Sequence, residues 1–112
     1  MNLNESFERL VHNELPLREY LRFERQCKRL VTKACRRYKI QDLVLNKTLL
    51  NDTIQDIYTK SLLKVIDKFD VTKSKFSTYF YYKSLSAARS EAGKLKRRLF
   101  INNTYSLDER RT

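Results

Sequence analysis

The chain has 112 residues, a formal net charge of +11, one Gly, one Pro and no Trp. A chain of this length forms one domain with a modest core. Because sheets with hairpins need turn residues, this composition predicts an all-α protein, a compact helical domain of three to five helices. The sequence shows no long apolar run and no signal-peptide pattern, so we expect neither a membrane partner nor secretion.

Two helices are predicted in the first third of the chain. A short one covers residues 4–13, with Asn4 as a possible N-cap. Pro16 separates it from a long helix expected from about Leu17 to Lys39. Apolar residues recur along the long helix every three or four positions, which indicates one buried face. Its other faces carry many Arg and Lys residues, which either meet nucleic acid or form a solvated surface.

The long helix contains the two cysteines, Cys27 and Cys35. Eight residues of helix separate them by about 12 Å, which is too far for a disulfide. With a single His in the chain, they also fall short of a structural zinc site. We therefore expect reduced, partly buried thiols, as in a cytoplasmic protein. No catalytic site, metal site or cofactor is expected, because the sequence shows no nucleophile–base pair, metal-ligand cluster or phosphate-cradling Gly loop. Ser77 and Ser86, for example, have no His partner in sight.

A second long helix is predicted after a Leu-rich connector, residues 40–51. Asp52 is expected to begin it, and Gln55 three residues later completes a capping box. The buried face of this helix is predicted from its apolar spacing to comprise Ile54, Ile57, Tyr58, Leu62, Val65, Ile66 and Phe69.

The last helix is predicted to start near Phe76 or Ser77 and to reach at least Ala92, after a polar loop over residues 70–74. Gly93 is expected to end or kink it. A basic run follows over 94–98, and residues 99–112 are expected to form a tail. We therefore expect one helical domain over residues 1–98.

An aromatic cluster opens this last helix, and basic residues flank it. The cluster is Phe76, Tyr79, Phe80, Tyr81 and Tyr82. Residues 71–112 hold ten Lys or Arg and three acidic residues. Aromatic faces stack on unpaired bases while cations hold the neighbouring phosphates. The stretch therefore indicates a surface for single-stranded nucleic acid, although Phe76 and Phe80 could instead belong to the core.

Three blocks of the sequence resemble region 2 of bacterial sigma factors of the sigma-70 type. The first is Ala34-Cys35-Arg36-Arg37-Tyr38, at the end of the long helix. The second runs from Asp52-Thr53-Ile54-Gln55-Asp56 to Phe69-Asp70. The third is Lys75-Phe76-Ser77-Thr78-Tyr79. Three ordered blocks are a more specific signal than any one of them, and the resemblance covers roughly residues 23–109.

The resemblance implies two binding surfaces. In the family, the second block binds the β′ clamp of the RNA polymerase core, which assigns that role here to Asp52, Gln55, Asp56 and the nearby Tyr58. Helix capping is the alternative role for Asp52 and Gln55. In the family, the third block captures and melts the promoter minus-ten element on the single-stranded non-template strand. By position and charge, the DNA-binding set is Lys73, Lys75, Phe76, Tyr79, Tyr82, Lys83, Ser86, Arg89, Lys94, Lys96, Arg97 and Arg98.

The sequence also departs from the family. Two adjacent tryptophans of housekeeping members are Tyr82-Lys83 here, and a glutamine that reads duplex DNA is Ser86. The family's promoter sequence therefore does not carry over. No counterpart of region 4 follows, so the chain is expected to be a fragment, or a stand-alone region 2 that could need a second protein to supply region 4.

The leading hypothesis is a cytoplasmic sigma-like transcription initiation factor, nucleoid-associated or acting in an infected bacterial cell, with no enzymatic activity of its own. Two alternatives stay open. One is a single-strand nucleic-acid-binding module that acts without polymerase. The other is a polymerase-binding transcription adaptor that makes no specific DNA contact.

Overall fold

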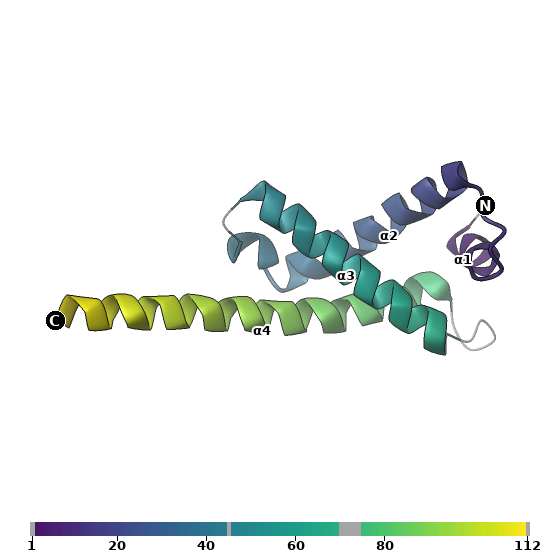
Figure 1. The fold of residues 1–112 in the computed structure, drawn as a ribbon. Helices are drawn as coiled ribbons and strands as arrows, with labels where there is room; N and C mark the ends of the chain where they lie inside the picture. Colours follow the sequence, from purple (N-terminus) through teal and green to yellow (C-terminus); the bar gives the residue numbers. More distant parts are fainter. Residues whose placement is uncertain (1, 45, 70–74, 112) are drawn as a thin grey trace.

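The computed structural model describes residues 2–44, 46–69 and 75–111, and their side chains as far as Ile101. The described residues form four α-helices and one short 3-10 helix, α1 (Leu3–Val11), α2 (Leu17–Arg37), η1 (Ile40–Asp42), α3 (Lys47–Lys68) and α4 (Phe76–Arg111). The predicted all-α fold class is therefore confirmed. Figure 1 shows α3 crossing α2 and then α4, with the far end of α4 extending to the left and α1 closing the opposite end.

The first helix is capped by a different residue from the one predicted. The side chain of Asn2 accepts a hydrogen bond from the backbone N–H of Glu5 at 2.9 Å, so the helix begins at Leu3. Asn4 lies inside this helix, and its Oδ1 instead accepts a hydrogen bond from the backbone N–H of Phe76 at 2.6 Å. Asn4 therefore satisfies one of the free N–H groups at the start of α4 and ties α1 to it.

The helix α2 begins at Leu17, as predicted after Pro16, and ends at Arg37. The predicted end at Lys39 is two residues too late. Lys39 has a positive φ of 55°, in the left-handed region, which a continuing right-handed helix cannot include. The chain then makes the turn η1, and Ile40 is buried there.

The helix α3 begins five residues before the predicted start at Asp52. Asn46 is the N-cap, because its side chain accepts a hydrogen bond from the N–H of Leu49 at 2.9 Å. Leu50, in the supposed connector, already packs against the core. The predicted capping box is therefore wrong, and Asp52 and Gln55 lie within the helix.

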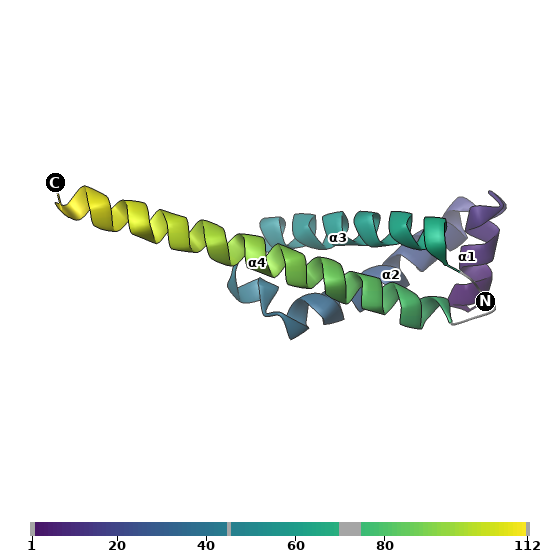
Figure 2. The same cartoon turned by 90° about the horizontal axis from the view of Figure 1, so that it is seen from below.

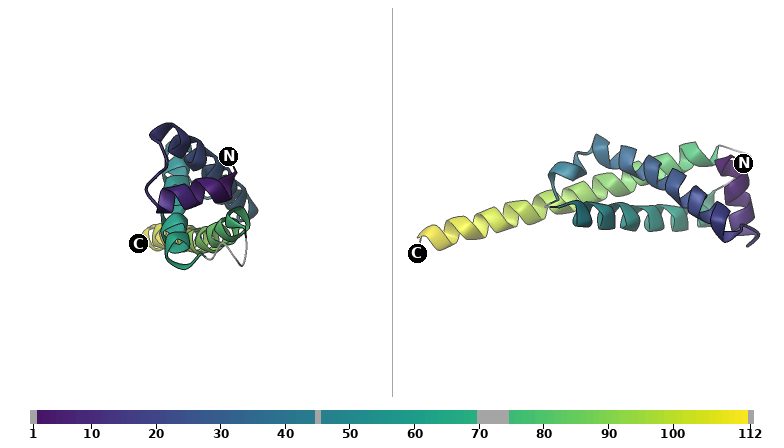
Figure 3. Two further views of the ribbon diagram at one scale, coloured as in Figure 1. Left: turned by 90° about the vertical axis from the view of Figure 1, so that its right-hand side faces the viewer. Right: turned by 90° about the horizontal axis from the view of Figure 1, so that it is seen from above.

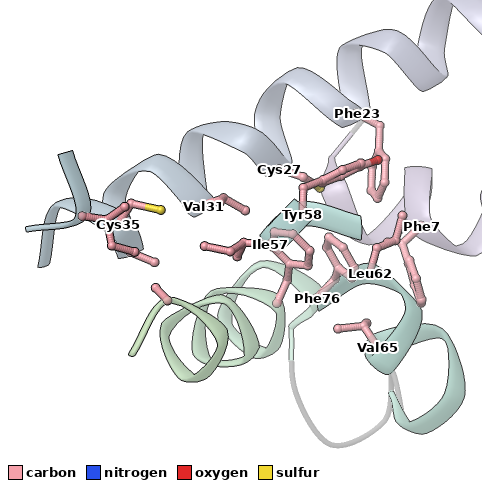
Figure 4. Packing of buried hydrophobic residues seen from close by; sticks show 14 of the residues in the cluster. Phe7, Phe23, Cys27, Val31, Cys35, Ile57, Tyr58, Leu62, Val65 and Phe76 are labelled. Carbon is pink, nitrogen blue, oxygen red and sulfur yellow. The ribbon is translucent and has the colours of Figure 1, made fainter. Parts of the chain in front are cut away.

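The core is built around the ring of Phe76, the first residue of α4. Its centroid lies 4.6 Å from that of Phe7, 5.5 Å from Phe23, 6.0 Å from Phe69 and 5.4 Å from Phe80. These rings come from α1, α2 and α4 and from Phe69, the residue that caps the end of α3. Figure 4 shows Phe7, Phe23 and Phe76 pointing into this core. The aromatic cluster thus fixes where α4 begins.

The helix α4 continues past the bundle. Gly93 neither ends nor kinks it as predicted, because its φ is not positive and good helix formers flank it. Leu95 still packs against the core, whereas residues 96–101 are exposed. The residues of the predicted tail are helical as far as Arg111. Figures 2 and 3 show this end of α4 projecting from the other helices.

This projection determines the overall shape. The radius of gyration is 17.4 Å, whereas a globule of this length has about 13 Å. The first half of α4 therefore packs against the other helices, whereas the second half extends beyond them.

Candidate nucleic-acid and polymerase interface

The exposed side of α4 carries three of the predicted DNA-binding residues in one row. Tyr82, Ser86 and Arg89 follow one another at steps of four and three residues, which places them on one face of the helix. All three are exposed, and Tyr82 keeps 64% of its surface accessible. The buried positions Phe80, Ser84 and Ala88 follow the opposite side. An aromatic ring, a hydroxyl and a guanidinium are thus presented together.

Tyr79 lies at the edge of this surface and is half-buried. Its ring packs against Phe69 with a centroid distance of 5.5 Å, and the Lys83 ammonium lies 5.3 Å from its centroid. Tyr79 and Tyr82 were both predicted to bind DNA, but they are not equally exposed. Tyr82 offers a ring face to a base as the structure stands, whereas Tyr79 already has an aromatic neighbour and a cation against its ring.

Phe76 was predicted to contribute to the DNA surface, and the structure contradicts this. Its side chain is completely buried, because α1 and α2 cover it from one side and Phe69 and Phe80 from the others. A base cannot reach its ring without displacing Phe7. Phe80 is also fully buried, so the alternative of a core role holds for both phenylalanines.

The remaining predicted cations lie along the length of α4 or just before it. Lys75 is exposed where the helix begins, and four more cations are exposed near or beyond its last contact with the core, Lys94, Lys96, Arg97 and Arg98. Arg97 Nε donates a hydrogen bond to the carbonyl of Gly93 at 3.3 Å. Lys73 lies outside the described residues. The basic run is therefore a helical, solvent-facing surface and not a flexible connector.

The predicted polymerase-binding residues of α3 share one exposed face. Asp52, Gln55 and Asp56 are all exposed, on the side opposite the buried Ile57, Ser61 and Val65. Asp56 forms an ion pair with Lys60 at 2.9 Å, which raises the pKa of Lys60. Gln55 Nε2 donates to Thr59 Oγ1 at 3.4 Å. These contacts are short-range and solvent-facing, so a partner can replace them at little cost.

Tyr58 was predicted to lie near this face, but it points to the other side of α3. Its side chain is buried, and its hydroxyl lies 3.3 Å from that of Tyr20 on α2. Burial, followed by the hydrogen bond with Tyr20, raises the pKa of Tyr58 well above its usual range. The position follows from helical geometry, since Tyr58 continues the buried face of Ile54 and Ile57. Tyr58 therefore joins α2 to α3 and is not available to a partner.

One groove joins the two predicted surfaces. It has a volume of about 290 Å³ and lies between α3 and α4. Its walls include Asp56 from the predicted polymerase face and Ser86 and Lys94 from the predicted DNA set, together with Lys60 and Glu91. The sequence resemblance treats these blocks separately, and the packing of α3 on α4 brings them side by side.

The two thiols belong to the core. Cys27 and Cys35 are free, as predicted, and they are fully buried, whereas partial burial was expected. Burial raises the pKa of Cys27 far above its ordinary value, and raises that of Cys35 to about 11, with smaller contributions from Glu24 and Glu91. Neither thiol is therefore ionised near neutral pH. Within the described residues, no group of His, Cys, Asp or Glu could hold a metal ion.

No family model, curated protein or solved structure matches the chain. None of the helices in the described part of the chain is both long and apolar enough to cross a membrane. The function is therefore inferred from the residues and their geometry.

Proposed function

We propose that this chain is a sigma-like transcription initiation factor. It docks on the clamp of the RNA polymerase core through α3 and helps to recognise and open the promoter through α4. The observation that carries the proposal is the pair of adjoining exposed faces. Asp52, Gln55 and Asp56 lie on α3, and the row from Tyr82 to Arg89 lies on α4. The first set reaches the groove through Asp56, and the second reaches it through Ser86.

The α3 face suits a protein partner that presents arginines. Carboxylate and amide oxygens accept hydrogen bonds from guanidinium groups, and bonds to the carboxylates are charge-assisted. The capping role considered for Asp52 and Gln55 does not apply, because Asn46 caps the helix. Among the described residues, the side chain of Asp52 forms no hydrogen bond or ion pair, so its carboxylate is available to a partner.

The α4 face suits an unpaired strand. Unstacking and turning out a base costs a few kcal/mol, and each base stacked on an aromatic ring returns about 1–3 kcal/mol. With Phe76 in the core, Tyr82 is the main stacking surface, and Tyr79 offers a partly covered second ring. Arg89 and the cations from Lys94 to Arg98 can hold the phosphates. The polymerase itself would supply the remainder of the opening energy.

A second candidate is a single-strand nucleic-acid-binding module that needs no polymerase. The exposed ring of Tyr82 beside Arg89 favours it, since this pairing binds a strand whether or not α3 has a partner. The third candidate, an adaptor that binds polymerase without specific DNA contact, predicts instead that Tyr82 is dispensable.

Co-purification with core RNA polymerase tests the proposal. The variant Gln55→Lys/Asp56→Lys should lose core binding, because it places two cations opposite arginines. A matched control exists in η1, where Gln41 and Asp42 are also exposed. Gln41→Lys/Asp42→Lys makes the same change of residues and charge away from the α3 face, and it should bind normally. Equal binding by both variants would overturn the role of α3, and equal loss would show an effect of net charge alone.

A further inference from the structure

The helix α2 carries a row of cations that the proposed function does not use. Six of them recur at steps of three and four residues, and all are exposed, Arg18, Arg22, Arg25, Arg29, Lys33 and Arg36. We refer to these six as the α2 basic face. They lie on the side of α2 away from its buried residues Phe23, Cys27 and Val31. At a rise of about 1.5 Å per residue the row is about 27 Å long.

The positive charge of this face is not neutralised within the molecule. The two acidic residues of α2 are paired elsewhere, since Glu19 lies 3.8 Å from Arg9 of α1 and Glu24 lies 2.8 Å from Lys28. In the described part of the chain, no ion pair involves any of the six cations. Like charges one turn apart on a helix repel one another. A bound polyanion would remove this repulsion.

A shallow, open groove borders these cations. Its volume is about 880 Å³ and its lining comes from α2 alone, including Arg25, Arg29, Lys33 and Arg36 with one acidic residue, Glu24. Both aromatic residues of α2, Tyr20 and Phe23, pack into the core. The groove therefore offers positive charge over a long straight path, without a ring on which an unpaired base could stack.

The α2 basic face leads to the exposed row on α4. The Lys33 ammonium lies 5.5 Å from the ring centroid of Tyr81, and that ring lies 6.4 Å from the ring of Tyr82. Cations on α2 and the exposed aromatic ring on α4 thus belong to one continuous side of the molecule. Figure 1 shows α2 approaching α4 toward the C-terminal end of α2.

We propose that the α2 basic face binds the phosphate backbone of double-stranded DNA. A duplex presents a dense, straight array of negative charge, and about 27 Å of it corresponds to about 8 base pairs at ~3.4 Å each. The absence of a stacking ring within the described residues of α2 favours a duplex over an unpaired strand. This proposal goes beyond the proposed function, because duplex binding by α2 needs no polymerase.

The test compares two triple variants that lose the same charge. Arg22→Gln/Arg25→Gln/Arg29→Gln alters the α2 basic face, and Lys47→Gln/Lys64→Gln/Lys68→Gln alters exposed positions of α3. Gln is a helix former comparable to Arg and Lys, so both variants should keep the wild-type helicity and melting temperature. Binding of a fluorescent mixed-sequence duplex is measured by anisotropy over a range of salt concentrations, without polymerase.

The α2 variant should lose at least about tenfold in duplex affinity at ~0.1 M salt. Its plot of log affinity against log salt should become shallower by about 2.7, since each lost phosphate contact removes about 0.9. The α3 variant should change affinity less than about threefold, and Arg22→Lys/Arg25→Lys/Arg29→Lys should keep most of it. Tyr82→Ala should bind the duplex normally, which separates this surface from the strand-binding surface on α4.

Three results would overturn the proposal. Equal losses by the α2 and α3 variants would show that only net charge matters. An unchanged affinity of the α2 variant would show that duplex DNA binds elsewhere. Displacement of the duplex by polyglutamate at equal charge would assign the α2 basic face to an acidic protein. If Gln55→Lys/Asp56→Lys still bound polymerase, the proposed function would be contradicted, but the duplex-binding measurement would not change. The two proposals can therefore fail independently.

Discussion

The exposed faces of α3 and α4 differ in chemistry although they share a groove. The α3 face presents two carboxylates and an amide, and one carboxylate already pairs with a lysine. The α4 face presents a tyrosine ring, a hydroxyl and a guanidinium. Acidic and amide groups suit a protein rich in arginine, whereas rings and cations suit a nucleic acid. Variants should therefore separate the two functions, provided that the common core stays intact.

Among the predictions, a substitution in the core beneath both faces should have the largest effect, and that effect is on stability. Phe76→Ala removes the ring that contacts four other aromatic rings, and it should lower the free energy of unfolding by about 3–5 kcal/mol. Urea denaturation followed by circular dichroism measures this loss. Tyr82→Ala, on the exposed side of the same helix, is the control and should change stability little. A small effect of Phe76→Ala would mean that Phe76 is not the centre of the core.

Loss of the exposed ring should separate the two faces. Tyr82→Ala should weaken binding of single-stranded DNA by about 1–3 kcal/mol, because one stacking surface is removed. Tyr82→Phe keeps the ring and should retain most of the affinity. Val11→Ala, an exposed apolar residue at the end of α1 and away from both faces, controls for the loss of surface. Polymerase binding should be unchanged in all three variants. A loss of polymerase binding in Tyr82→Ala would mean that the α3 and α4 faces do not act separately.

High pH should destabilise the fold through the buried thiols and the buried tyrosine. The ordinary pKa of a thiol is 9.0 and that of a tyrosine is 10.0, and burial raises those of Cys27, Cys35 and Tyr58 in the folded protein. Above pH 9 the unfolded chain therefore releases protons that the folded chain keeps. Each such group lowers the free energy of unfolding by up to about 1.4 kcal/mol per pH unit, so stability is full below about pH 9 and falls above it.

Urea denaturation at about pH 8 and at about pH 10.5 measures this fall. Cys27→Ala/Cys35→Ala should show a shallower pH dependence than the wild-type protein, whatever its stability at neutral pH. An unchanged dependence would mean that the thiols are not the groups that titrate.

The smallest expected effect concerns the tie between α1 and α4. Asn4→Ala removes the side-chain acceptor for the N–H of Phe76 and should cost about 1 kcal/mol of stability, the usual value of a lost helix cap. Asn2→Ala removes the cap of α1 itself and is the matched control. Hydrogen exchange should quicken at the start of α4 in the first variant and at the start of α1 in the second. The same pattern in both would contradict the role of Asn4.

Local patterns predicted much of this fold. The apolar spacing of α2 and α3 gave their buried faces, since Phe23, Cys27, Ile57 and Leu62 are all buried. An exception is Ile66, which the spacing placed in the core and which is 43% exposed. The start of α4 was predicted within one residue.

The errors came from contacts distant in sequence or from competing caps. Asp52 has good capping chemistry, but Asn46 lies further upstream and begins the helix first. Asn4 does cap a helix, although its partner is 72 residues away. Phe76 looked equally suited to a base or to a core, and only the packing of α1 and α2 decides between them. Tyr58 was placed by resemblance, whereas helical spacing alone assigns it to the buried face.

Promoter opening in a reconstituted system tests the central claim most directly. The assay combines core polymerase, this protein and a promoter DNA that is first selected for binding to their complex. Permanganate then reacts with unpaired thymines and reports opening. We predict reactive thymines with the wild-type protein. With Tyr79→Ala/Tyr82→Ala we predict a complex that forms but stays closed. Normal opening by the double variant, or no reactive thymine with the wild-type protein and bound core polymerase, would contradict the assignment of strand capture to α4.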